Sequence, residues 1–379
     1  MKILVNAISA RQGGIVTYTR NLMRSFQQRK LDATFAVSEG FPTVEGIPTL
    51  VLRANSYSPL KRAVWEQTMW RLMVLRHNPD VLYSSANFAL FFSPCPQLLL
   101  MREGGLFDPF YLVNLAPEQG LKNAVTRVAR RTLMRWSERA ADLIMTPTHG
   151  TRDLLVAWDP HAAGKYRVNL YGTLSDTFRP DHAIRPWRQD GTLRILYVSV
   201  YYPHKNPGVL VETIRALKRL GIDAHATITM SLDEVRAVGG SALDVHELEA
   251  GERDGLITLG RRDYSELPQL YQTHDVFVFP SMGETFGHPM AEAMSSGLPL
   301  IAADHPINRE ICGDAGLYHR PFSAHSICEQ LMVLDQDPDL RRRLCGVGPT
   351  RVAELFKWED HVDRLVGIFK ETIETRHRR

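Results

Sequence analysis

The chain has 379 residues, which is enough for two domains of ordinary size, each with a buried core of its own. Its 45 basic and 42 acidic residues give a net charge of +3. This near balance, with no recognition motif, argues against nucleic acid as the main partner. The four cysteines are scattered and form no C-x-x-C pair, which argues against a disulfide framework or zinc site and indicates a reducing, cytoplasmic compartment.

The sequence shows no segment that is expected to span a membrane. The first apolar run ends at Asn6, so it is too short for the core of a signal peptide and is expected to be a β-strand. The later apolar segment 88–101 is interrupted by Pro94 and Pro96 and falls short of the ~20 residues that a span needs. We therefore expect a cytoplasmic protein. Peripheral contact with the inner face of the cytoplasmic membrane is compatible with this expectation.

Short apolar runs alternate with helical patterns along both halves of the chain. Such alternation predicts βα units and parallel sheets, and hence an α/β fold with two Rossmann-like lobes. The first helical pattern covers 15–29, and a longer one lies within 127–148. The expected strands lie within 2–8, 33–38, 80–85, 97–101, 194–200, 225–230, 256–260, 275–281 and 298–303.

A polar, proline-bearing stretch separates the two halves. It precedes an apolar strand that begins near Leu193, and such stretches commonly link domains. We therefore expect a first lobe over residues 1–180, a linker over 181–192 and a second lobe over 193–356. Residues 357–379 are predicted to form a final helical segment.

The stretch GETFGHPMAEAMSSGLPLIAA, residues 283–303, carries the strongest functional signal. Gly287 lets the backbone approach a ligand closely, and Pro289 suits the first turn of a helix. We expect Glu284 in a loop and Glu292 in that first turn, beside N–H groups that attract an anion. A glutamate there is favoured by the helix dipole in any protein, but the order of strand, glycine-flanked acid, helix and strand indicates a ligand site.

Three other positions carry weaker signals. Gly13 and Gly14 follow the first strand and would let the backbone approach a substrate, although many strand-to-helix turns use glycine. Lys205 follows the first strand of the second half, where it could neutralise a diphosphate or be a solvated loop lysine. Arg261 and Arg262 are placed similarly and either border a nucleotide or belong to a charged loop.

The helical pattern over residues 122–139 has two faces. In one interpretation its apolar stripe packs inward under a solvated basic face, and in the other it is a basic amphipathic helix that rests on anionic lipid. The stripe consists of Val125, Val128, Thr132 and Trp136, and the basic face of Arg127, Arg131, Arg135 and Arg139.

These motifs together resemble the retaining glycosyltransferases of family 4, whose two Rossmann-like lobes form the GT-B fold. The resemblance covers about the whole chain. The paired-glutamate stretch is its most specific part, and FKW at 356–358 is similar to the lead into a last helix that crosses back to the first lobe. Further similar segments are GGIVTYTRNL, YPHKN, LGRRDYSELPQLY and NREICGDAGLYHRP.

The resemblance implies a cleft between the lobes for a nucleotide sugar, and it implies roles for individual residues. Glu292 would hold the ribose hydroxyls, and Glu284 would lie near the transferred sugar. Lys205 would bind the diphosphate, with Gly14 approaching from the opposite lobe. Backbone amides would face the sugar or the phosphates at Phe286, Gly287 and His288.

The sequence departs from the family pattern in two places. Many relatives carry an arginine a few residues before the lysine, but the run from Ser199 to Tyr202 contains none. Many also carry a histidine after a strand of the first lobe, where this chain has LLLMREGGLFDPF. Glu103 or Asp108 would occupy that acceptor-side region, or a carboxylate there is polar packing.

The resemblance implies retaining transfer of a sugar from a GDP- or UDP-linked donor to a glycan or lipid-linked acceptor, with bacterial surface polysaccharide as the setting. We expect no metal ion or other cofactor, because no Asp-x-Asp pair follows a strand. The diphosphate itself would take the acceptor's proton. Two alternatives remain: a nucleotide-sugar 2-epimerase of the same architecture, and a non-catalytic nucleotide-sugar-binding subunit.

Overall fold

The chain forms two compact units in this computed structural model. The first comprises Met1–Asp108, Gln119–Leu170 and Glu359–Arg379, and the second comprises Pro109–Glu118 and Tyr171–Trp358. The two halves of the sequence therefore do not coincide with the two units. The described residues are 1–10, 14–54, 57–114, 120–173, 177–180, 186–238 and 240–378.

The first unit is built on a seven-stranded sheet with the order β3-β2-β1-β4-β5-β6-β7. Every neighbouring pair is parallel. All residues of β2 and β4 are buried, as expected for strands covered by helices on both faces. The strands are β1 (Ile3–Asn6), β2 (Ala33–Ser38), β3 (Thr49–Leu52), β4 (Val81–Ser84), β5 (Gln97–Leu100), β6 (Leu143–Thr146) and β7 (Tyr166–Val168).

The last helix of the chain, α15 (Trp358–His377), packs on the first sheet. Its Phe369 meets the rings of Phe26 and Tyr83 edge to face, and Nε2 of His361 lies 3.1 Å from the hydroxyl of Tyr18. The other helices of this unit are α1 (Gly14–Gln28), α2 (Pro59–Trp65), a π-helical turn (Glu66–Trp70), α3 (Arg71–His77), α5 (Gly120–Ala140) and α6 (His149–Trp158), with 3₁₀ turns at Gly104–Phe107 and Pro160–Lys165.

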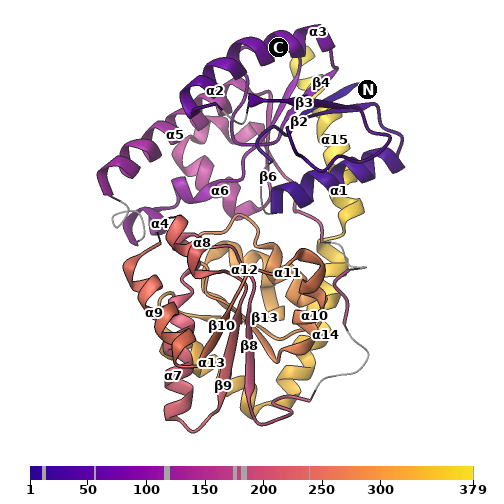
Figure 1. Cartoon of the computed structure of the whole chain (residues 1–379). Coiled ribbons are helices and arrows are strands. Elements are labelled where there is room, and N and C mark those ends of the chain that lie inside the picture. Colours follow the sequence, from indigo (N-terminus) through magenta and orange to yellow (C-terminus); the bar gives the residue numbers. More distant parts are fainter. Residues whose placement is uncertain are drawn as a thin grey trace. The chain divides into compact units, whose positions relative to one another are not determined.

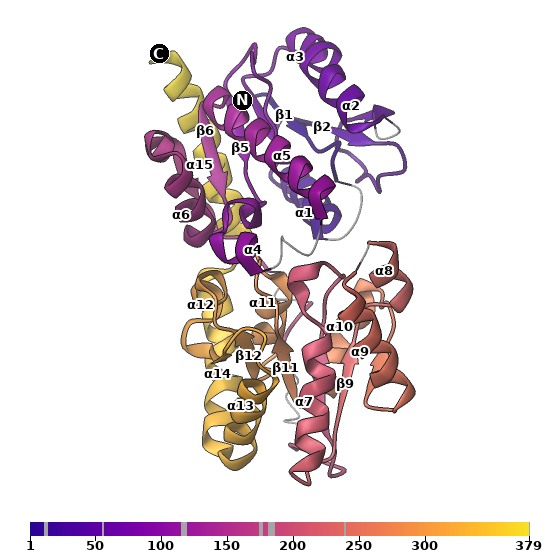
Figure 2. The same ribbon diagram turned by 90° about the vertical axis from the view of Figure 1, so that its left-hand side faces the viewer.

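The second unit has a six-stranded parallel sheet with the order β10-β9-β8-β11-β12-β13. Helices cover both faces: α7 and α9 lie on one side and α10, α11 and α14 on the other (Figures 1 and 2). The strands are β8 (Leu193–Tyr197), β9 (Ala224–Ile228), β10 (Ile257–Leu259), β11 (Val276–Phe279), β12 (Leu300–Ala303) and β13 (Gly316–His319).

The helices of the second unit include one from the first half of the sequence, α4 (Pro109–Asn114). The others are α7 (Gly208–Arg219), α8 (Leu232–Ala237), α9 (Ala242–Arg253), α10 (Leu267–Thr273), α11 (His288–Ser295), α12 (Pro306–Cys312), α13 (Ala324–Gln336) and α14 (Pro338–Leu355), with 3₁₀ turns at Pro203–Lys205, Tyr264–Glu266 and Gly313–Ala315.

The expected α/β class with two parallel sheets is confirmed. The expected linker lies partly outside the described residues, at 181–185. Residues 357–379 were expected to form a final helix that crosses back to the first lobe, and α15 belongs to the first unit from Glu359 onward. None of the helices in the described part of the chain is long and apolar enough to cross a membrane.

The apolar stripe of helix α5 faces outward. The interpretation in which this stripe packs inward under a solvated basic face is therefore wrong. Val125 is 63% exposed, and Val128 and Trp136 are also exposed. Three of the four arginines contact the protein instead: Arg135 and the more exposed Arg139 lie 3.2 and 3.4 Å from the buried carboxylate of Asp159. Arg131 covers the ring of Trp158. The groups that turn this basic face inward are Trp158 and Asp159, which lie about 20 residues or more further along the chain, at the end of α6.

Candidate functional site

The strand order of the second sheet reverses between β8 and β11. The chain moves outward from β8 to β9 and β10, and it then returns to place β11 on the other side of β8. The loops after β8 and β11 therefore diverge at the carboxyl edge of the sheet, where open α/β sheets usually bind ligands. Lys205 follows β8 and Glu284 follows β11, so the two predicted residues come from these two loops.

Lys205 and Glu284 form a buried ion pair and a hydrogen bond from Nζ to Oε1. Their side chains are only 10% and 11% exposed, so Lys205 is not a solvated loop lysine. Burial raises the pKa of the Glu284 carboxyl, but the charge of Lys205 outweighs this effect and holds that pKa well below its usual range. Glu284 is therefore ionised at neutral pH.

Backbone and hydroxyl groups hold this pair in place. Ser281 donates its hydroxyl hydrogen bond to the same Oε1 of Glu284. The amide of Asn308, which is fully buried, donates to the carbonyls of Ser281 and Ala303 at 2.9 Å each. On the other side of the pair, Tyr197 donates to the carbonyl of Lys205 at 2.8 Å. The ends of β8, β11 and β12 are thus tied together around the two charges.

Glu292 lies in a different environment, although it is only eight residues from Glu284. It is 6% exposed and accepts hydrogen bonds from the hydroxyls of Tyr264, at 3.2 Å, and Tyr271, at 3.0 Å. Burial raises the pKa of the Glu292 carboxyl to about 7, and the two hydroxyl donors oppose this rise only in part. A carboxyl that is so placed can accept hydrogen bonds from a pair of ligand hydroxyls.

The start of α11 differs from the expectation. The helix begins at His288, so its first turn contains no acid and the predicted first-turn position of Glu292 is wrong. Gly287 precedes it with φ +79°, a conformation that L side chains rarely adopt, and a Cβ there would lie 2.4 Å from Cε of Met290. The rings of Phe286 and His288 pack against each other and against Tyr171.

The segment after β10 reaches the site through a tyrosine rather than through its arginines. Arg261 is 72% exposed and pairs with Glu234, and Arg262 is exposed. Tyr264, three residues after Arg261, instead contacts Glu292. Tyr264 and Tyr271 were not predicted from the sequence, although their spacing of seven residues would have placed both on one helical face. Ser281 and Asn308 were not predicted either, because their roles depend on contacts that no local pattern predicts.

Two tyrosines occupy the run before Lys205, where many relatives carry an arginine. In the run that precedes Lys205, the buried Tyr201 donates its hydroxyl hydrogen bond to Asp244 at 2.7 Å. Tyr202 is half-exposed and stacks on the ring of His204. Neither side chain supplies positive charge beside Lys205, so the charge of the lysine is not reinforced from its own loop.

The remaining predicted residues lie in the first unit. Gly14 is the exposed first residue of α1, and Gly13 lies outside the described residues. Glu103, which follows β5, pairs with Arg130 of α5 and accepts a hydrogen bond from the amide of Asn87 at 3.2 Å. Asp108 is buried at 4% exposure. The structure therefore brings Glu103 into a polar cluster at the carboxyl edge of the first sheet.

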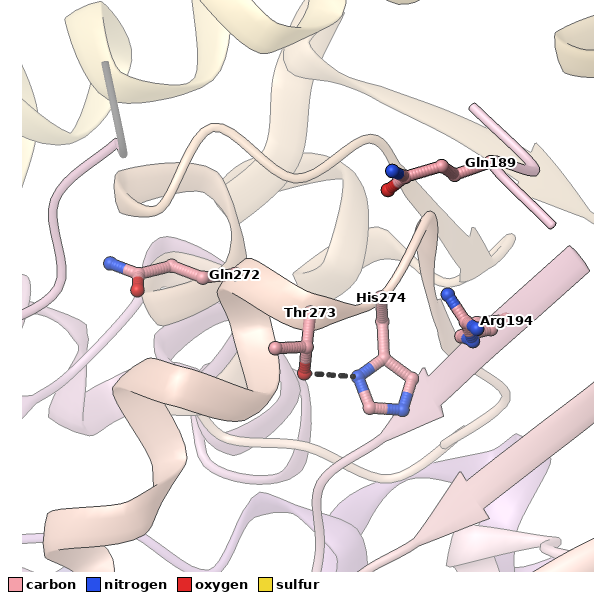
Figure 3. Close-up of a pocket in the computed structure, with 5 residues that line it drawn as sticks. All are labelled: Gln189, Arg194, Gln272, Thr273 and His274. Carbon is pink, nitrogen blue, oxygen red and sulfur yellow. Dashed lines mark hydrogen bonds between the residues drawn. The ribbon is translucent and has the colours of Figure 1, made fainter. Parts of the chain in front are cut away.

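A separate cavity of about 440 Å³ lies at the opposite, amino edge of the second sheet. Figure 3 shows its lining side chains, which include Arg194 at the start of β8 and His274 just before β11. His274 uses both ring nitrogens internally, at 2.7 Å from the carbonyl of Leu270 and 2.9 Å from the hydroxyl of Thr227. Because the cavity contains none of the predicted residues, it is not the candidate site.

Comparison with known proteins relates both halves of the chain to the same kind of enzyme. A family model described as "Glycosyl transferases group 1" matches residues 181–345, and one described as "Glycosyl transferase 4-like domain" matches residues 13–172. O-antigen chain mannosyltransferase B of Escherichia coli is 30% identical over 176 residues, which cover 46% of this chain and 45% of that enzyme. The chain thus spans less than half the length of this curated relative.

Solved structures show the same fold. Sucrose-phosphate synthase from Thermosynechococcus elongatus has a TM-score of 0.78 at 18% identity, with 98% of this chain and 99% of that chain covered. HepE from Anabaena in complex with UDP-glucose has a TM-score of 0.73 at 18% identity, with 98% and 100% covered. At this identity the likeness concerns the fold, which is the GT-B architecture.

Replacing Lys205 with methionine should destabilise the protein by about 3–5 kcal/mol, because Glu284 would be left as a buried unpaired charge. The double variant Lys205→Met/Glu284→Gln should recover much of this loss. Denaturant unfolding of the wild type, both single variants and the double variant gives the coupling energy. Lys218→Met is the control, since its pair with Asp223 is exposed and should be worth less than about 1 kcal/mol. Equal costs for the two lysine variants would contradict the assignment.

Glu292→Gln should change how stability depends on pH. Because the folded-state pKa of Glu292 is about 7 against an ordinary 4.5, its favourable contribution is complete below pH 4.5 and is lost as pH rises through 7. Relative to the wild type, the variant should therefore gain about 3 kcal/mol of unfolding free energy between pH 4 and pH 8. Denaturant unfolding at several pH values measures this gain, with the exposed Glu252→Gln as control. A difference that does not vary with pH would contradict the raised pKa.

Proposed function

The chain belongs to the glycosyl transferases group 1 family, and we propose that it moves a sugar from a GDP- or UDP-linked donor to a hydroxyl of a glycan or lipid-linked glycan. The observation that carries this proposal is the buried pair of Lys205 and Glu284 at the reversal of strand order in the second sheet, with the buried Glu292 eight residues after Glu284 in the chain. The named activity of the Escherichia coli relative favours bacterial surface polysaccharide as the product.

Each residue of the site has a role that its surroundings support. The ammonium group of Lys205 has three donors, so it can hold Glu284 and a diphosphate oxygen together. Glu284, ionised beside Lys205, can accept hydrogen bonds from hydroxyls of the transferred sugar. Glu292 would exchange its tyrosine donors for the ribose hydroxyls. Backbone groups around Gly287, at the amino end of α11, would add positive potential near the phosphates.

The proposed reaction retains the anomeric configuration. The bond from the anomeric carbon to the diphosphate breaks while the acceptor oxygen bonds to the same face of the sugar, and the departing diphosphate takes the acceptor's proton. Lys205 stabilises the charge that develops on the diphosphate, so no divalent metal ion is required in this scheme. Glu284 is a charged hydrogen-bond acceptor beside the sugar and not a nucleophile.

The activity test is the release of nucleoside diphosphate by the purified chain, first with and then without acceptor. Glu292→Ala should raise the donor KM by roughly 10-fold to 100-fold, because charged hydrogen bonds to the ribose are lost. Lys205→Ala should lower kcat by about 10²-fold to 10³-fold. The exposed Glu252→Ala is the control. Near-normal kinetics in either site variant would contradict its role, and turnover of donor without acceptor would point to an epimerase. NMR of the product anomer tests retention.

We also propose that the first unit contacts an anionic membrane surface. Two helical regions, α2–α3 and α5, and the loop beside them expose large apolar side chains. The ribbons of these helices can be followed in Figure 2. Arg71 of α3 donates to the carbonyl of Phe92 at 2.7 Å, and the rings of Phe91 and Trp136 lie 6.1 Å apart, which links the three elements. We call this the apolar face: Leu60, Val64, Met69, Leu72, Leu75, Phe92, Val125, Val128 and Trp136.

The charges around the apolar face favour anionic lipid as its partner. Lys61, Arg71 and Arg76 lie on the same helices as the first five of its residues. The acids of these helices are not available to repel lipid, because Glu66 pairs with Arg62 and Glu138 is 1% exposed. Apolar contact area flanked by basic residues is the pattern of interfacial helices.

Flotation with vesicles tests this contact. The wild type should float with vesicles that contain phosphatidylglycerol and much less with pure phosphatidylcholine, and added salt should weaken the binding. Phe92→Asp and Val128→Asp should reduce flotation, because each adds a negative charge to an exposed apolar position. Leu243→Asp changes an exposed leucine of the second unit and is the control. Equal flotation of all four proteins would contradict the proposal.

A further inference from the structure

Helix α4 is a short segment of the first half of the sequence that belongs to the second unit. The residues before and after it in the chain, up to Asp108 and from Gln119, belong to the first unit, whereas Pro109–Glu118 belong to the second. Two consecutive aromatic side chains of α4, Phe110 and Tyr111, make the ring contacts that attach it.

Phe110 attaches α4 beside the last two strands of the second sheet. Its ring stacks on that of Phe322, with centroids 6.0 Å apart and an interplanar angle of 17°, and it meets His305 edge to face. Phe322 follows β13 and His305 follows β12. Phe322 has φ +59°, which is unfavourable for a bulky residue. The aromatic contact of Phe110 fixes one end of α4 at the carboxyl edge of the sheet.

Tyr111 attaches α4 at the loop after β8. Its ring meets His204 edge to face, with centroids 6.1 Å apart and an interplanar angle of 62°. His204 also stacks on Tyr202 of its own loop and lies against the loop after β11: a Cβ on Gly283 would lie 3.1 Å from Cγ of His204, and the amide of Met282 donates to the His204 carbonyl at 3.0 Å. His204 is therefore held between Tyr111 and the loop that carries Glu284.

His204 is covalently next to Lys205, and Gly283 is next to Glu284. A side chain that fixes His204 against Gly283 consequently fixes the backbone positions of both members of the ion pair. Burial and the charge of Lys205 lower the pKa of His204, so its ring is neutral at neutral pH and packs as an aromatic group. Shifts near 1 Å in such positions can lower a rate by about 10²-fold.

We infer that Tyr111 is a positioning residue of the donor site, acting through His204 to hold Lys205 and Glu284 in their paired geometry. The expected effect on kinetics rests on the proposed function, whereas the expected effect on the pairing of Lys205 with Glu284 is independent of it. Tyr111 is thus a residue of the site that comes from the first half of the sequence. Through it, α4 packs against the loops after β8 and β11 and holds them in place.

Kinetics of Tyr111→Leu, Tyr111→Phe and Val113→Ala test this role. Tyr111→Leu should lower kcat/KM for the donor by roughly 10-fold to 100-fold while the acceptor KM stays unchanged. Tyr111→Phe keeps the ring and should retain wild-type kinetics. Val113 is 71% exposed on the same helix, so Val113→Ala is the matched control. Wild-type kinetics in Tyr111→Leu would overturn the inference. So would an equal loss in Tyr111→Phe, because the hydroxyl would then act directly.

A second measurement separates this inference from the proposed function. The coupling between Lys205 and Glu284, obtained from unfolding of the Lys205→Met and Glu284→Gln cycle, should be smaller in a Tyr111→Leu background than in the wild type. Unchanged coupling would overturn the positioning role whatever the enzyme does. If the wild type turns over no nucleotide sugar and the coupling still falls, the proposed function fails and the positioning role stands.

Discussion

The ion pair of Lys205 and Glu284 ties together the two loops on which the candidate site depends. Removing two charges from water is costly, and their attraction repays that cost only when further hydrogen bonds support it. Ser281 supplies such a bond directly, and Asn308 fixes the backbone that carries it. Because the paired loops follow β8 and β11, the pair joins the sheet where its strand order reverses. A buried ion pair contributes little net stability, so its presence at the carboxyl edge of this sheet is better explained by ligand binding.

Glu284 and Glu292 are only eight residues apart, but their different surroundings suit them to different roles. Glu284 has a buried cation beside it and stays ionised, whereas Glu292 has only hydroxyl donors, and burial shifts its pKa upward. The first is suited to a permanent charge near the reacting centre. The second is suited to an exchange of partners, because Tyr264 and Tyr271 offer the same kind of O–H donor that a ribose offers.

Local patterns in the sequence predicted much of the architecture and part of the site. Continuous apolar runs such as ATFAVS identified buried parallel strands, and the glycine-flanked acid after a strand identified Glu284. Short strands such as β7 were missed because three residues carry little periodicity. The inward arginines of α5 depend on Asp159, and the position of Tyr111 depends on His204. Such partners are distant in sequence, so no pattern within one element could reveal them.

The connectivity of the two units has a consequence for engineering. A simple chimera would join the first half of this chain to the second half of a related enzyme. In this chain a junction near residue 171 would bring along α4, whose Phe110 and Tyr111 are matched to Phe322 and His204 of the discarded half. It would also replace α15, whose Phe369 packs on the retained first sheet. A chimera that keeps the whole first unit therefore exchanges two separate segments, Pro109–Glu118 and Tyr171–Trp358, rather than one.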